Sequence, residues 1–100
     1  MMNFLAKHID AIRNLCSRHH VKQLYAFGSV LTDQFGADSD VDLIVDFDAV
    51  KLEDYADNYY DLKFSLENLL NRPVDLLESR AIKNPFLKQS IAQSQQLVYG

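Results

Sequence analysis

The chain has 100 residues, of which 48% are hydrophobic and 24% are charged, values typical of one small globular domain with a buried core. We therefore expect a single domain over residues 1–100. Its 14 acidic and 10 basic residues give a net charge of -4, which disfavours non-specific binding to a nucleic-acid backbone. The apolar runs are too short to cross a bilayer, and the start of the sequence lacks a secretory signal pattern. We expect a cytoplasmic protein that contacts neither nucleic acid nor membrane directly.

Hydrophobic spacing in the first third of the chain predicts a helix, a strand and a short helix. Apolar residues three and four positions apart over about residues 4–19 indicate an amphipathic helix, with Asn3 as its N-cap. Residues 21–27 are rich in strand formers and end at Gly28, which predicts a strand followed by a tight turn. A brief helix is expected over residues 30–35.

The rest of the chain alternates strands with helices. Residues 40–47 alternate polar and apolar side chains, which predicts a strand with one buried face. A long amphipathic helix is expected from Leu52 to the stop at Asn71-Arg72-Pro73, with Leu52 on its apolar stripe. A strand over 74–77, a helix opened by Asn84-Pro85 and running to about Ser94, and an edge strand over 97–99 complete the series. This order predicts an α+β fold, a small mixed β-sheet with helices packed against it.

Cysteine and histidine give little sign of chemistry. Cys16 is the one cysteine, so it forms no internal disulfide, and its place in a helical apolar pattern predicts a buried side chain. His8, His19 and His20 lie on or just after the first helix, and no H-E-x-x-H pattern occurs. We expect these histidines at the surface or at helix ends rather than as metal ligands.

The pattern G-S-x10-D-x-D joins the first two predicted strands. Gly28 allows a sharp turn, and Ser29 offers a hydroxyl and backbone N–H groups at the start of a helix, where an anion is favoured. Asp40 and Asp42 project from the same face of a strand with Cα atoms about 6.6 Å apart, so their carboxylates can share one metal ion or bridge two. The pattern therefore predicts a phosphate site beside a divalent-metal site.

Asp75 supplies a third candidate carboxylate. It is the one acid inside an apolar strand expected to lie beside the strand of Asp42, and a buried charge is costly unless it is paired or coordinated. Oxygen ligands without cysteine favour Mg²⁺ or Mn²⁺ over zinc. Taken singly, these residues are also typical of a plain turn, an exposed strand end or an ion pair with a Lys or Arg. Their combination favours a site for a metal and a nucleotide.

Other metal and nucleotide motifs do not fit this sequence. Asp38, Asp40 and Asp42 match the first ligands of a calcium loop, but Leu43 stands where that loop needs glycine and Ala49 where it needs glutamate. Neither the P-loop pattern nor G-x-G-x-x-G occurs in the sequence.

The Gly28-Ser29 pair, the ten-residue spacer, Asp40-Val41-Asp42 and the later Asp75 in Pro-Val-Asp-Leu-Leu resemble the minimal nucleotidyltransferases of the DNA polymerase beta-like superfamily. The resemblance spans nearly the whole chain and implies the nucleotidyltransferase fold. Such proteins often occur as the antitoxin of a pair whose toxin is a HEPN-domain ribonuclease. The resemblance implies a Mg²⁺-dependent adenylyltransferase that moves AMP from ATP onto a tyrosine of the toxin and so silences it.

Carried onto this chain, the resemblance implies a role for each motif residue. Gly28 and Ser29 would hold the triphosphate, Asp40 and Asp42 would bind Mg²⁺, and Asp75 would complete the metal site or accept the proton of the attacking hydroxyl. Two alternatives stay open: an antitoxin that neutralises its toxin by binding alone, and nucleotidyl transfer to RNA or a small molecule. The chain could also form a homodimer or a hetero-oligomer with the toxin.

Acidic residues are concentrated in the middle of the chain. Residues 38–61 contain nine acids and one base, Lys51, and the acidic surface left after metal binding would suit a basic ribonuclease. In the long helix, Tyr55 and Tyr59 follow the apolar stripe and are expected in the core, whereas Tyr60 is the better candidate for contact with a partner.

Overall fold

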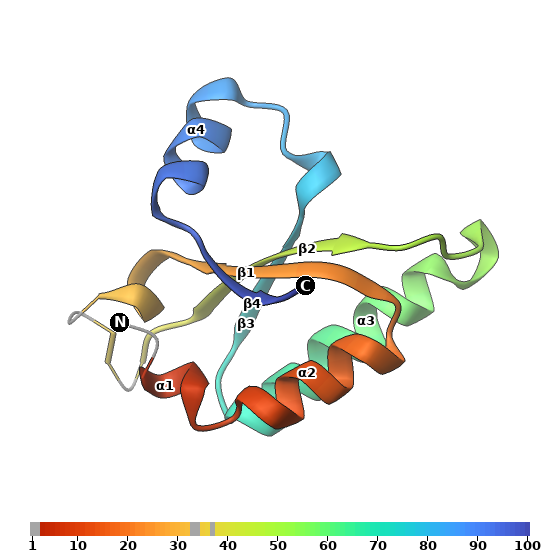
Figure 1. Ribbon diagram of the computed structural model, residues 1–100, viewed down its shortest axis with the longest axis horizontal. Helices are drawn as coiled ribbons and strands as arrows, with labels where there is room; N and C mark the ends of the chain where they lie inside the picture. Colours follow the sequence, from red (N-terminus) through yellow and green to blue (C-terminus); the bar gives the residue numbers. More distant parts are fainter. Residues whose placement is uncertain (1–2, 33–34, 37) are drawn as a thin grey trace.

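A four-stranded mixed sheet organises the chain (Figure 1), and its strand order is β3-β2-β1-β4. The computed structural model describes residues 3–32, 35–36 and 38–100. The central strand β1 pairs antiparallel with β2 and with β4, whereas β2 and β3 are parallel. The predicted mixed sheet is thus confirmed, with the last strand at an edge. The strands are β1 (Val21–Phe27), β2 (Val41–Phe47), β3 (Val74–Glu78) and β4 (Gln96–Tyr99).

Helices lie on both sides of this sheet. The helices α2 and α3 pack side by side against one face, and α4 lies on the opposite side (Figure 1). Within the described residues, the structure has no helix of the length and apolar character that a membrane span requires. The helices are α1 (Asn3–Ala6), α2 (Ile9–Arg18), α3 (Leu52–Leu70) and α4 (Pro85–Ser94), with short 3₁₀ turns at η1 (Gly28–Leu31) and η2 (Ser79–Ala81).

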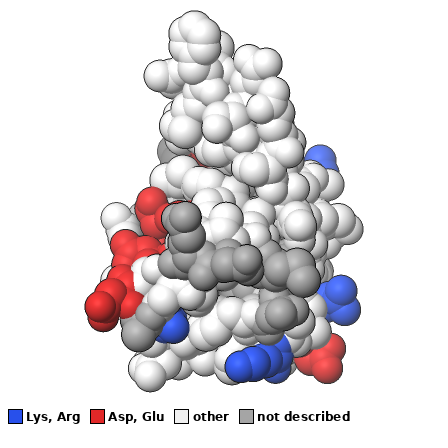
Figure 2. Space-filling model, turned by 90° about the vertical axis from the view of Figure 1, so that its left-hand side faces the viewer, with Lys and Arg blue, Asp and Glu red and all other residues white. Residues whose placement is uncertain are grey.

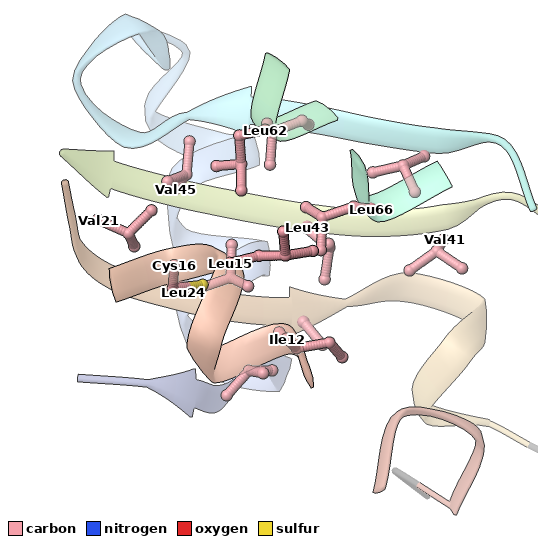
Figure 3. Packing of buried hydrophobic residues seen from close by; sticks show 14 of the residues in the cluster. Ile12, Leu15, Cys16, Val21, Leu24, Val41, Leu43, Val45, Leu62 and Leu66 are labelled. Carbon is pink, nitrogen blue, oxygen red and sulfur yellow. The ribbon is translucent and has the colours of Figure 1, made fainter. Parts of the chain in front are cut away.

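The core fills the space between the sheet and the pair α2 and α3 (Figure 3). In β2, Val41, Leu43, Val45 and Phe47 are buried, as the alternating pattern predicts. They join leucines of α3 and apolar residues of α2 in one cluster. Because side chains alternate across a strand, Asp42 must lie on the opposite face of the sheet, away from this core.

Local sequence signals set the ends of two helices where they were predicted. Asn84 caps α4, since its side chain accepts hydrogen bonds from the backbone N–H groups of Phe86 and Leu87, and Pro85 follows at the first helical position. Asn71 ends α3 in the left-handed conformation at φ 55°.

The predicted first helix is wrong in one respect, because it is broken into α1 and α2. Asn3 is the first residue of α1 rather than its N-cap. The break follows from a tighter turn in which the His8 N–H donates to the Leu5 carbonyl, while the His8 carbonyl accepts the first bond of α2 from Ile12. This bend leaves Leu5 buried and Phe4 against Phe35.

Two further expectations need correction. The short helix expected over 30–35 is the single 3₁₀ turn η1, which stops where Thr32 is extended at φ -122° and ψ 167°; positions 33–34 lie outside the described residues. Leu52, expected on the apolar stripe of α3, is instead 91% exposed. In α3, contact with the core begins at the partly buried Tyr55, three residues after Leu52.

Candidate functional site

Gly28 directly follows β1 and brings the backbone close to a carboxylate. Its φ of +76° is a conformation that glycine adopts at little cost. A Cβ atom at this position would lie 2.5 Å from Oδ2 of Asp42, which is closer than side-chain carbon and oxygen atoms can approach. The absence of a side chain at Gly28 therefore lets the turn after β1 pass directly against Asp42, as a tight turn at this glycine predicted.

Strand pairing brings Asp42 and Asp75 together. They occupy matched positions in the parallel pair of β2 and β3, so they share one face of the sheet, and adjacent strands are about 4.8 Å apart. Asp42 is also paired with Phe27, the residue before Gly28, across β1. The expectation that the strand of Asp75 neighbours that of Asp42 is confirmed.

The charges of three aspartates interact at this site. Asp42 is half-buried, and its pKa is raised above the ordinary value first by loss of solvation and then by repulsion from Asp75 and Asp40. Asp75 is exposed, so its expected burial is wrong. It lies on the edge strand β3 and faces away from the core, where α2 and α3 do not cover it.

The three aspartates have the ligand chemistry that a hard divalent cation prefers, although their side chains do not form a complete coordination site. Among the residues that the structure describes, no three His, Cys, Asp or Glu side chains lie close enough together to hold a metal ion as they stand. Asp40, Asp42 and Asp75 nevertheless offer only oxygen ligands, which Mg²⁺ and Mn²⁺ prefer. The repulsion that raises the pKa of Asp42 is also the penalty that a bound cation removes.

Ser29 lies in the 3₁₀ turn η1, beside Gly28. Its carbonyl accepts hydrogen bonds from both the N–H and the hydroxyl of Thr32, each at 2.9 Å, which fix the turn. The first N–H groups of a helical turn have no acceptor within that turn. Ser29 therefore lies at the start of a single 3₁₀ turn rather than of the longer helix that was predicted, and its contact with an anion stays a prediction.

Arg72 is a residue near the site that sequence analysis missed. It belongs to the Asn71-Arg72-Pro73 stretch expected to end the long helix, but its Nη1 atom also donates to the carbonyls of Gly36 and Ser39, just before Asp40. No spacing pattern links position 72 to position 36 or 39, so the sequence holds no local signal for this contact.

The tyrosines of α3 divide as predicted between core and surface. Tyr55 and Tyr59 are partly buried against the core, and the Tyr59 hydroxyl donates to the Leu76 carbonyl. Tyr60 is 52% exposed and stacks on Phe64, which is 56% exposed, with ring centroids 6.0 Å apart. We call Tyr60 and Phe64 the aromatic pair.

The charge on one side of the molecule is segregated (Figure 2). Acidic side chains gather at one edge of this view and most of the basic ones lie toward the other. The uppermost part, formed by α4 and its flanking segments, is uncharged in this view.

His19 and Cys16 serve the fold rather than a site. His19 lies at the end of α2, as expected of a surface or helix-end histidine, and it is buried. Its Nδ1 lies 2.7 Å from the Leu15 carbonyl and its Nε2 lies 2.6 Å from Oδ2 of Asp61. Cys16 is buried as predicted, and burial raises the pKa of its thiol to about 12, so it is not a reactive thiolate.

Comparison with known proteins gives one consistent family. The sequence profile of the nucleotidyltransferase domain matches residues 9–98. A Methanocaldococcus jannaschii protein named "Putative protein adenylyltransferase MJ1379" is 32% identical over 95 residues, which cover 95% of this chain and 89% of that protein. A similarly named protein of the same organism, MJ0128, is 33% identical and covers 97% of this chain and 91% of its own length.

Solved structures agree with this result. A structure described as a minimal nucleotidyltransferase superposes with a TM-score of 0.79 at 29% identity, covering 95% of this chain and 93% of that chain. A Shewanella oneidensis complex of a tri-AMPylated HEPN toxin with its MNT antitoxin gives a TM-score of 0.66 at 20% identity, covering 95% and 71% of the two chains. The latter likeness establishes the fold alone.

The profile match covers most of the chain, and the curated relatives align over nearly its full length. The structure meanwhile pairs the strands that carry Asp42 and Asp75 beside the Gly28 turn. The chain therefore belongs to the nucleotidyltransferase family and is a minimal nucleotidyltransferase domain.

Proposed function

We propose that this chain is a Mg²⁺-dependent protein adenylyltransferase that transfers AMP from ATP to a tyrosine of a HEPN ribonuclease toxin in the cytoplasm and thereby neutralises it. The observation that carries this proposal is the matched pairing of Asp42 and Asp75 beside the Gly28 turn. The names of the curated relatives and the toxin complex among the structural neighbours support the choice of a protein acceptor.

Each site residue has a role in this reaction. Gly28 and Ser29 would hold the triphosphate at the turn after β1, and Asp40 and Asp42 would hold Mg²⁺ or Mn²⁺, with Asp75 as a third ligand or as a base. The bound ion would supply charge neutralisation at the α-phosphate and at the departing pyrophosphate. The Gly28 turn is exposed, and it keeps the backbone N–H groups after β1 directly beside the Asp42 carboxylate, so the phosphates and the ion would be bound next to each other.

The attacking group, the hydroxyl of the acceptor tyrosine, is a poor nucleophile while it is protonated. A tyrosine hydroxyl has a pKa near 10, so it needs a base to attack at neutral pH. In the proposed step the tyrosine oxygen bonds to the α-phosphorus, the bond from that phosphorus to the bridging oxygen breaks, and pyrophosphate leaves. Asp75, which is exposed and lies beside Asp42, would receive the hydroxyl proton.

The aromatic pair would contribute to binding of the toxin. Tyr60 and Phe64 are exposed on α3, and this helix carries five acidic residues and one lysine. Lys63 lies over the Phe64 ring at 5.9 Å, but acids outnumber bases on the helix as a whole, which suits a partner whose contact surface is basic. The same acidic surface disfavours RNA as the acceptor.

One observation favours the alternative of neutralisation by binding alone. The aromatic pair lies on α3, which packs against the opposite face of the sheet from Asp42 and Asp75. A toxin bound at α3 could be blocked without receiving AMP.

The decisive experiment combines the chain with ATP, Mg²⁺ and the protein encoded by the adjacent gene, followed by mass spectrometry of that protein. We expect mass increments of one AMP on a tyrosine, lost in Asp42→Asn and retained in Asp46→Asn, which removes a charge from the same strand. An unmodified partner contradicts the proposed transfer. Full neutralisation by an Asp40→Asn and Asp42→Asn double variant would establish binding alone.

A further inference from the structure

One dipeptide holds the backbone on both sides of Asp40. The Ser39 carbonyl accepts a hydrogen bond from Nη1 of Arg72 at 3.2 Å. The Val41 N–H donates to the Pro73 carbonyl at 2.9 Å. Asp40 lies between these two contacts, so its backbone is tied to Arg72-Pro73 from either side.

The guanidinium of Arg72 is itself held in place. The same Nη1 atom lies 2.6 Å from the Gly36 carbonyl. The guanidinium carbon lies 4.7 Å from the centroid of the Phe35 ring and 5.1 Å from that of Phe4. A planar guanidinium can stack on aromatic rings and donate in its own plane at the same time, which an ammonium group cannot do.

The segment that Arg72 contacts is also closed on itself. The Ser39 N–H donates to the Gly36 carbonyl at 3.1 Å, and the Gly36 N–H donates to the Ser39 hydroxyl at 3.0 Å. Arg72 therefore joins a turn that already has internal hydrogen bonds, and fixes it relative to the start of β3.

The sheet does not need this contact for its own register. From Val41 onward, β2 is held by its ladder with β3 and by its pairing with β1. Asp40 lies just before β2, outside the ladder. Loss of Arg72 would therefore affect the position of Asp40 more than the position of Asp42.

We propose that Arg72 is a positioning residue, which acts through Ser39 and Gly36 to hold the Asp40 carboxylate where it can share a divalent cation with Asp42. This inference rests on the proposed function, because it takes Asp40 as a metal ligand. Side chains that orient a ligand commonly affect metal affinity by roughly 10- to 100-fold.

The test measures binding of Mn²⁺ together with a non-hydrolysable ATP analogue, by the electron paramagnetic resonance signal of free Mn²⁺. We expect Arg72→Gln to weaken Mn²⁺ binding by about 10- to 100-fold. Arg72→Lys keeps the charge and the stem but not the planar fork, and is expected to weaken it less. Arg80→Gln is the matched control, since Arg80 also lies over an aromatic ring, that of Tyr55 at 5.7 Å, at the other end of β3.

Asp40→Asn separates this inference from the proposed function. If Asp40→Asn loses Mn²⁺ binding while folded Arg72→Gln and Arg72→Lys bind as the unmodified chain does, the positioning role is wrong and the metal site stands. If Asp40→Asn also binds normally, the assignment of Asp40 is wrong and the inference falls with it. Circular dichroism identifies a variant that fails to fold, and Arg72→Lys, which keeps the positive charge and a side chain of similar length, then carries the test.

Discussion

The backbone at Gly28 and the carboxylate of Asp42 are in such close contact that a Cβ atom at position 28 would lie 2.5 Å from Oδ2. The same glycine has a φ of +76°. Two independent features, steric space and backbone conformation, therefore require glycine at the point where the turn meets the aspartates.

Gly28→Ala should consequently reduce both stability and activity. We expect a loss of about 1 to 3 kcal/mol in the free energy of unfolding, from the strained backbone conformation and displacement of Asp42. Transfer of AMP should fall by more than tenfold even at temperatures where the variant is folded. Urea unfolding and a transfer assay measure the two effects.

Gly36→Ala is the control for this change. A Cβ atom at position 36 would meet nothing within 4 Å, so both quantities should stay close to those of the unmodified chain. A Gly28→Ala variant that matches Gly36→Ala in stability and in transfer would contradict the close approach described above.

Asp42→Asn should separate stability from activity. In the metal-free chain this substitution removes a partly desolvated charge that Asp75 and Asp40 repel, so the free energy of unfolding should rise. Transfer of AMP should fall by about a hundredfold or more, because an amide is a poor ligand for Mg²⁺. A decrease in both quantities would show that Asp42 serves the fold, and Asp46→Asn controls for removal of a charge from β2.

The pH dependence of stability follows from the raised pKa of Asp42. In the interval between the ordinary Asp value of 3.8 and the higher folded value, the folded chain binds more protons at this site than the unfolded chain. The contribution of Asp42 to the free energy of unfolding therefore decreases as pH rises through that interval. It stays at this lower value at neutral pH. Asp42→Asn should lack this decrease. Urea titrations of both proteins from about pH 4 to about pH 7, without Mg²⁺, test the difference.

Binding of Mg²⁺ with ATP should stabilise the chain. Ligand at a hundredfold excess over its dissociation constant adds about 2.7 kcal/mol to the free energy of unfolding. The increase should be absent in the Asp40→Asn and Asp42→Asn double variant and should be reversed by a chelator. A thermal shift that is the same with ATP alone would show that the carboxylates hold no metal.

Substitution of the aromatic pair should weaken toxin binding without affecting the fold. Tyr60→Ala with Phe64→Ala should raise the KM for the toxin by about tenfold or more, which corresponds to about 1.4 kcal/mol. The melting temperature should change little, because both side chains are exposed. Phe86→Ala, on α4 and 81% exposed, is the control that removes an exposed ring elsewhere. Equal effects of the two changes would argue against a specific contact at α3.

The sequence predicted those features that depend on neighbouring residues. The start of α4 follows from the adjacent Asn84 and Pro85, and the buried face of β2 follows from simple alternation. The adjacency of Asp42 and Asp75 could also be expected, since both lie in apolar strands joined by one long helix.

Features that depend on distant contacts were missed. The exposure of Asp75 depends on which elements cover the second face of the sheet, and α4 packs there near Ile44 and Ile91 instead. The burial of His19 depends on two residues of α3. The Asp61 carboxylate lies against the His19 ring, and the Asn58 side chain donates a hydrogen bond to the His19 carbonyl. Neither relationship leaves a pattern in the local sequence.

The parallel pairing of β2 with β3 also affects the order in which the molecule is assembled. The whole of α3 separates Asp42 from Asp75 along the chain, so their strands meet through a non-local, parallel pairing, a type of contact that forms more slowly than local ones. A chain in which β3 has not yet paired with β2 therefore lacks the paired aspartates and the chemistry that depends on them.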